Sequence, residues 1–88
     1  MRLEKEFYVI VFDSTHHAIQ TEKRLKESFQ IEMIPTPREI TASCGLSIKF
    51  LPAQLSKMME ALKLEEDSKL KVFKITKVGM NKHVTPVL

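Results

Sequence analysis

Residues 7–12 read Phe-Tyr-Val-Ile-Val-Phe, an uninterrupted apolar run rich in β-branched and aromatic side chains. Such a run is typical of a central strand that is covered on at least part of both faces. The polar residues Asp13, Ser14 and Thr15 follow at once, and their side-chain oxygens can cap a helix. The sequence therefore predicts a strand that leads directly into a helix over about residues 15–29.

The predicted first helix has one apolar stripe at helical spacing. We expect all four of its members in the core: Ala18, Ile19, Leu25 and Phe29. Glu22 lies among them, and Lys26 follows it at the i,i+4 spacing of a helical ion pair. Two roles are open for Glu22. It either stays at the edge of the stripe, or it pairs with Arg38 and holds the following loop against the helix.

Alternation, helical spacing and proline positions predict four more elements. They are a strand at 31–34, a strand at 46–50, a helix that begins near Pro52 and a strand at 72–78. The order strand-helix-strand-strand-helix-strand predicts an α+β, ferredoxin-like fold, in which two helices cover one face of a four-stranded antiparallel sheet. We expect residues 1–78 to form this single domain, and residues 79–88 to be an extension, either a tail or an added strand.

In this topology the first two strands run parallel. The turn that enters the first helix and the loop after the second strand therefore emerge at the same end of the sheet. We expect Cys44, in that loop, to lie close to the Ser14–His17 turn. A helix N-terminus presents free N–H groups and partial positive charge, which stabilise a nearby thiolate.

The composition excludes several classes of protein. The longest apolar run is residues 7–12, far short of the roughly 20 residues of a membrane helix, and the charged start is not followed by a signal-peptide stretch. We therefore expect a soluble, cytoplasmic protein. One cysteine cannot form an internal disulfide, and two glycines cannot build a Gly-rich phosphate loop. We expect no cofactor.

The last quarter of the chain is basic. Residues 69–88 contain five lysines and no acidic residue. Such a stretch can attract an acidic partner or a phosphate backbone, or it can be a solvated edge-strand face on which lysine discourages aggregation. Only Tyr8 and Phe50 look available for base stacking, and the chain has no RNP-like aromatic pattern, so we do not expect nucleic acid as the partner.

The chemistry of the chain centres on Cys44, which lies between small residues and six positions after Arg38. Its thiolate would be stabilised by a cation such as Arg38 or His16, by the helix N-terminus, or by amides near Gly45. The other interpretation is a small buried cysteine at the start of a strand. A metal site is not favoured, because the three histidines have no ligand spacing with Cys44. An 88-residue chain also leaves little room for the cleft of a hydrolase.

Three segments, FDSTHHA, IPTPREI and SCGLSIKF, resemble in this order the putative selenium/sulfur carrier protein-like family, a bacterial domain of unknown function. The resemblance covers about residues 7–76. It singles out Ser14, Thr15, Pro37, Arg38, Ser43, Cys44 and Gly45. It implies that Cys44 carries sulfur or selenium as a persulfide or selenopersulfide between donor and acceptor proteins. Arg38, Ser43 and the loop amides would then stabilise the anionic sulfur.

A second hypothesis belongs to a different class of protein. The chain would be a non-enzymatic binding or regulatory module that forms a homodimer through an open sheet edge or through residues 79–88. Both hypotheses describe a carrier or binding protein rather than a stand-alone enzyme. A third, weaker one is salt-sensitive nucleic acid binding through the lysine-rich last strand.

Overall fold

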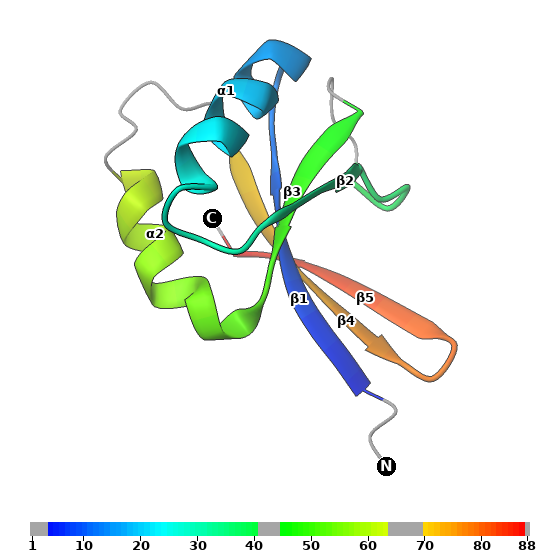
Figure 1. Ribbon diagram of the computed structural model, residues 1–88. Coiled ribbons are helices and arrows are strands. Elements are labelled where there is room, and N and C mark those ends of the chain that lie inside the picture. The colour runs from blue at the N-terminus through cyan, green and yellow to red at the C-terminus, as the bar shows by residue number, and fades with distance from the viewer. Residues whose placement is uncertain (1–3, 41–44, 64–69, 88) are drawn as a thin grey trace.

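The computed structural model describes residues 4–40, 45–63 and 70–87, shown as coloured ribbons in Figure 1. The elements are β1 (Glu4–Val11), α1 (Thr15–Leu25), β2 (Glu32–Pro35), β3 (Leu46–Phe50), the 3₁₀ turn η1 (Pro52–Gln54), α2 (Leu55–Lys63), β4 (Lys71–Val78) and β5 (Asn81–Pro86). The strands form one antiparallel sheet in the order β2-β3-β1-β4-β5. The α+β prediction is confirmed. The prediction of four strands is wrong, because the C-terminal residues supply a fifth.

Strand β1 lies in the middle of the sheet, with β3 on one side and β4 on the other. Its side chains alternate between the two faces, and Val9 and Ile10 are both 0% exposed. An apolar run without polar interruption suits this position, because both faces of the strand need apolar side chains. The strand begins three residues earlier than the apolar run, at Glu4, because pairing with β4 continues as far as Val78.

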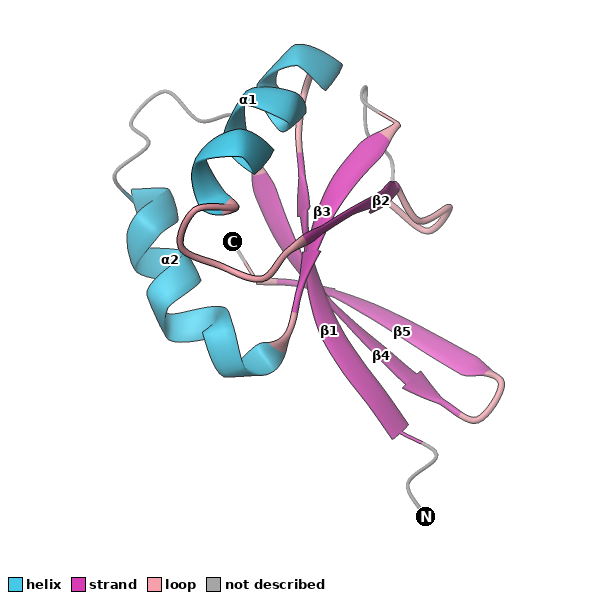
Figure 2. Ribbon diagram, viewed as in Figure 1, coloured by secondary structure: helices cyan, strands magenta, loops and turns pink. Residues whose placement is uncertain are grey.

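The two helices cover the same face of the sheet (Figure 2). Their buried residues Ala18, Leu25, Met58 and Leu62 pack in one cluster with Tyr8, Ile10 and Phe12 of the first strand and its end. Ile19 is 40% exposed, so the prediction that it belongs to the core is wrong. Helix α1 also ends at Leu25, four residues before the predicted end. Within the described residues, neither helix has the length and apolar composition needed to cross a membrane.

The only aromatic pair that the sequence suggested for base stacking is buried under the helices. The rings of Tyr8 and Phe50 stack on each other with centroids 5.4 Å apart. Both side chains belong to the helix-side core, at 6% and 1% exposed. The expectation that these rings are available to a ligand is therefore wrong.

The opposite face of the sheet, which we call the second face, has an apolar cluster of its own. Val9, Val11 and Ile75 are buried there together with Ile40, which belongs to the loop between β2 and β3. Half-buried apolar side chains pack around them: Phe7, Ile34, Phe73 and Val84. The loop residue Ile40 therefore packs on the second face, and Val84 of the edge strand β5 extends the cluster along the sheet beside Ile75.

Strand β5 folds back on β4 through a two-residue turn, Gly79-Met80, since Val78 pairs with Asn81. Gly79 has φ 61°, and no non-glycine residue in the described chain has a positive φ. A positive φ at the first turn position alone is the pattern of a type II′ hairpin turn. Residues 79–88 thus include an added strand that pairs within the same chain.

We expect Gly79→Ala to lower the free energy of unfolding by about 1–2 kcal/mol, because a Cβ disfavours the left-handed conformation that Gly79 adopts. Gly79→Asn should cost less, since asparagine tolerates this conformation better. Urea unfolding followed by circular dichroism measures both. Equal losses for the two variants would contradict a strained turn, because no atom lies within 4 Å of the added Cβ to cause a clash.

Candidate functional site

Helix α1 begins with a side-chain cap at the end of β1. Ser14 is the N-cap, and its Oγ accepts a hydrogen bond from the His17 backbone N–H at 3.2 Å. The His17 ring lies 3.4 Å through Nδ1 from Asp13 Oδ1, and its edge contacts the Phe12 ring with centroids 5.1 Å apart. No acidic residue occupies the first turn of the helix. The N–H groups of this turn give the start of α1 a partial positive charge. Because α1 begins directly after β1 ends, this charge lies at one end of the sheet.

The loop between β2 and β3 opens at the same end of the sheet. Val11, at the end of β1, pairs with Ser47, near the start of β3. Strands β1 and β2 are both antiparallel to β3 and hence parallel to each other, as predicted. Gly45 therefore lies at the end of the sheet where α1 begins, and Figure 1 shows the starts of α1 and β3 at the same end.

Three contacts anchor this loop on both sides of residues 41–44. The Thr36 N–H donates to the Gly45 carbonyl at 2.9 Å, and the hydroxyl groups of Thr36 and Ser47 are 2.8 Å apart. Ser47 is fully buried, so this bond also satisfies a polar group in the core. On the other side, the Ile40 N–H donates to the Pro37 carbonyl at 3.0 Å, and the Ile40 side chain is 6% exposed in the second-face cluster.

Cys44 and Ser43 lie outside the described residues. The residues that the sequence grouped with them lie on the neighbouring segments. Ser14, Thr15 and His16 are exposed at the start of α1, and Pro37 is half-buried, while Arg38 and Gly45 are exposed in the loop. The structure thus brings the two described halves of the predicted site to one end of the sheet.

Glu22 does not hold the loop against the helix. Its Oε2 lies 3.6 Å from Lys26 Nζ, which is the helical pair predicted by the i,i+4 spacing. The loop has a different ion pair, between Glu39 Oε1 and Lys82 Nζ at 3.2 Å, which joins it to strand β5. Sequence reasoning missed this pair because it depends on the position of a strand that was not predicted.

Three groups lower the pKa of the Glu39 carboxyl below its usual value. The largest effect is a hydrogen bond with the backbone of Glu39 itself, the hydrogen bond and charge of the Lys82 ammonium group come next, and the charge of Arg38 has a smaller effect. The ionised form of Glu39 is thus favoured in the folded loop, and its contribution is present at neutral pH and lost as the pH falls through the lowered pKa.

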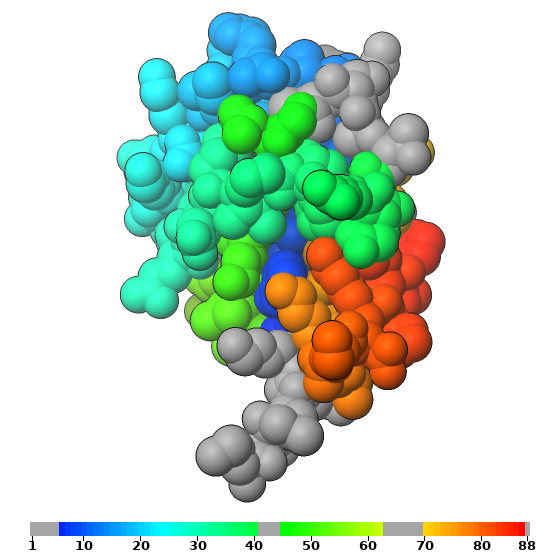
Figure 3. All heavy atoms as spheres, turned by 90° about the vertical axis from the view of Figure 1, so that its right-hand side faces the viewer, coloured from blue at the N-terminus to red at the C-terminus, as the bar shows by residue number. Residues whose placement is uncertain are grey.

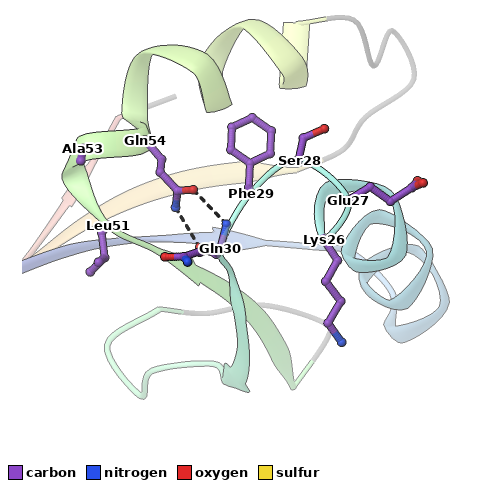
Figure 4. Close-up of a pocket in the computed structure, with 8 residues that line it drawn as sticks. All are labelled: Lys26, Glu27, Ser28, Phe29, Gln30, Leu51, Ala53 and Gln54. Atoms are coloured by element: carbon purple, nitrogen blue, oxygen red, sulfur yellow. Dashed lines mark hydrogen bonds between the residues drawn. The ribbon is translucent and has the colours of Figure 1, made fainter.

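A pocket lies at the opposite end of β3, where η1 follows Phe50. Its volume is about 390 Å³, and Figure 4 shows the side chains around it. The Gln54 side chain makes two hydrogen bonds with the backbone of Gln30, accepting one from the N–H at 2.9 Å and donating one to the carbonyl at 2.8 Å. Gly45 precedes the other end of β3, so this pocket is not part of the predicted thiol site. Among the described residues, no three His, Asp or Glu side chains are grouped as metal ligands.

We expect the titration midpoint of the Glu39 carboxyl to rise in Lys82→Gln, because both the hydrogen bond and the charge of Lys82 lower its pKa and the variant loses them. The midpoint should stay below the usual value, since the backbone hydrogen bond remains. Carboxyl-carbon NMR shifts recorded against pH measure it. Lys23→Gln on helix α1 is the charge-matched control and should leave the midpoint unchanged. The same midpoint in Lys82→Gln and in the original chain would contradict the bridge.

The chain is similar to a known protein family. A family model described as "Putative Se/S carrier protein-like" matches residues 7–77. The matched range runs from Phe7 in β1 to Lys77 in β4 and leaves β5 outside. No curated protein and no solved structure matches the chain significantly. Because the match covers most of the 88 residues, the chain belongs to the family described as "Putative Se/S carrier protein-like".

Proposed function

We propose that this protein carries sulfur or selenium on the thiol of Cys44 and passes it from a donor protein to an acceptor protein. The observation that carries the proposal is the family match, because a carrier of these elements needs a nucleophilic thiol and the chain has one cysteine. Cys44 is bonded to Gly45, and Gly45 lies at the sheet end where helix α1 begins.

The transfer needs no external oxidant or reductant. The Cys44 thiolate attacks the outer sulfur of a donor persulfide, R–S–SH, so that a new S–S bond forms on Cys44 and the donor leaves as R–S⁻. An acceptor nucleophile then attacks the outer sulfur of the Cys44 persulfide. The second S–S bond breaks, the sulfur leaves with the acceptor, and Cys44 returns as a thiolate. Selenium follows the same steps as a selenopersulfide.

The described surroundings support an anionic sulfur at this place. The first turn of α1 contains no acidic residue, while Asp13 just before the N-cap lies 3.4 Å from the His17 ring, and Thr15 and His16 are exposed in this turn. Arg38 is an exposed cation six residues before Cys44. In the proposal Arg38, Ser43 and the loop amides near Gly45 stabilise the charged sulfur, and Ser14 and Pro37 shape the two segments.

The broader assignment forms part of the same proposal. Within the sheet the order β2-β3-β1-β4, with both helices on one face, supports a ferredoxin-like fold extended by β5. We place the protein in the cytoplasm, where thiols stay reduced, and take the donor and acceptor to be proteins. A homodimer through a free tail has less support, because residues 81–86 already pair with β4 of the same chain.

We expect alkylation of Cys44 by iodoacetamide to have a pH midpoint about one unit or more below the free-thiol value of about 8.5. Arg38→Ala should raise this midpoint, because a nearby cation is lost. Mass spectrometry of the folded chain measures the rate, with urea-unfolded protein as the reference. A folded-state midpoint at or above the unfolded one would contradict an activated thiol.

We also expect the reduced protein to gain the mass of one sulfur atom when it is mixed with glutathione persulfide. Dithiothreitol should remove the added sulfur, since it attacks persulfides. Intact-mass spectrometry reads the result without ambiguity, because the chain has a single cysteine. Cys44→Ser is the control and should gain nothing. If Cys44 is alkylated in the folded protein but gains no sulfur, the thiol is accessible and the carrier function is wrong.

A further inference from the structure

Two lysine ammonium groups lie over one aromatic ring on the second face of the sheet. The ring is that of Phe7 on β1, and Lys49 Nζ lies 4.9 Å from its centroid while Lys77 Nζ lies 5.8 Å from it. Lys49 belongs to β3 and Lys77 to β4, the strands on either side of β1. The two lysines therefore converge on the ring from opposite sides.

Neither of these ammonium groups has a carboxylate partner among the side chains that the structure describes. Other lysines do, since Lys74 pairs with Glu6 at 3.3 Å and Lys82 pairs with Glu39 at 3.2 Å. Two like charges held over one ring repel each other, and the ring offsets only part of this repulsion. A bound anion between Lys49 and Lys77 would lower the electrostatic energy of both.

The second face has a hollow in its surface. Figure 3 shows β1 in blue at the bottom of this hollow, between the green segments that include β3 and the orange hairpin of β4 and β5. The half-buried side chains of Phe7 and Val84 belong to the apolar cluster of this face. The surface thus combines unpaired positive charge with apolar contact area.

We propose that the surface formed by Phe7, Lys49, Lys77 and Val84 on the second face binds an acidic segment of a partner protein. Carboxylates of the segment pair with the ammonium groups of Lys49 and Lys77, which lie over the Phe7 ring, and an apolar side chain of the segment packs against Val84. The proposal concerns a protein surface and does not rest on the thiol of Cys44.

Single-stranded nucleic acid fits the same face less well. Its sequence-tolerant binding uses bases stacked on open aromatic rings. Lys49 and Lys77 occupy the space over the Phe7 ring, Phe73 packs in the apolar cluster, and Tyr8 and Phe50 are buried on the helix side. Carboxylates need no free ring, so the arrangement favours an acidic peptide over a base.

The test measures the binding of a fluorescein-labelled synthetic peptide in which Glu and Asp alternate with Leu. Fluorescence anisotropy at rising salt gives its dissociation constant for the full chain. The double variant Lys49→Gln/Lys77→Gln should weaken binding about fivefold or more, because two charge pairs are lost. Lys23→Gln/Lys57→Gln removes the same charge from exposed positions on α1 and α2 and should change binding by less than about twofold.

Four results would overturn the proposal. Two concern the chain: the acidic peptide does not bind at millimolar protein, or both double variants weaken its binding equally. Two concern the ligand: a peptide with Gln and Asn in place of its acids binds equally well, or oligouridine binds more tightly through the same lysines. Circular dichroism and urea midpoints show whether each variant folds, and a charge-reversal pair, Lys49→Glu/Lys77→Glu, repeats the test independently. Cys44→Ser should bind the peptide as the original chain does. This separates failure of the surface from failure of the carrier function.

Discussion

The structure depends on the burial of β1 on both of its faces. Val9 and Ile10 are adjacent in the strand, point in opposite directions, and are both fully buried. A sheet with such a central strand is stable only if each face is covered, because an apolar face left in water loses the free energy of burial. The two helices cover the face of Ile10. The remaining residues must then cover the face of Val9.

A loop, and not a helix, packs on the second face. Ile40 comes from the loop after β2, while Val84 of the edge strand β5 extends the same cluster beside Ile75. The same requirement positions the loop, since burying Ile40 draws the preceding residues over the sheet and the Glu39–Lys82 ion pair ties them to β5. The loop that leads to Cys44 is therefore held by the core of the second face.

The elements with strong local patterns were predictable from the sequence, and those that depend on pairing were not. The alternation of Leu46, Ile48 and Phe50 predicts β3 with its observed bounds. The sequence does not decide whether residues 79–88 form a tail or a strand, because Val84 is the only half-buried residue of β5 and the period-2 pattern is weak. The Gly79-Met80 pair between two possible strands was the available signal, since glycine at the first position of a two-residue turn favours a hairpin. The predicted burial of Ile19 is wrong because an apolar residue at the edge of a helical stripe can face water, and the spacing of apolar residues does not reveal this.

The same distinction holds for the candidate sites. The meeting of the α1 N-terminus with the start of β3 follows from topology alone, and the sequence predicted it. The convergence of Lys49 and Lys77 on Phe7 requires the register of three strands, which hydrophobic periodicity does not supply. The Glu39–Lys82 pair requires both that register and the fold of the loop. Charged pairs across a sheet are thus the class of feature that only the assembled structure reveals.

Both candidate sites lie along strand β1. Phe7 and Val11 are four residues apart on β1, a separation of about 13 Å along the strand. Val11 pairs with Ser47, which follows Gly45 by two residues, so Gly45 and the proposed surface around Phe7 lie along the same part of the sheet. If both proposals hold, a protein segment held over Phe7 is anchored along β1 from Gly45. A charged docking surface at this position orients a partner on a small chain, which a single cysteine cannot do alone.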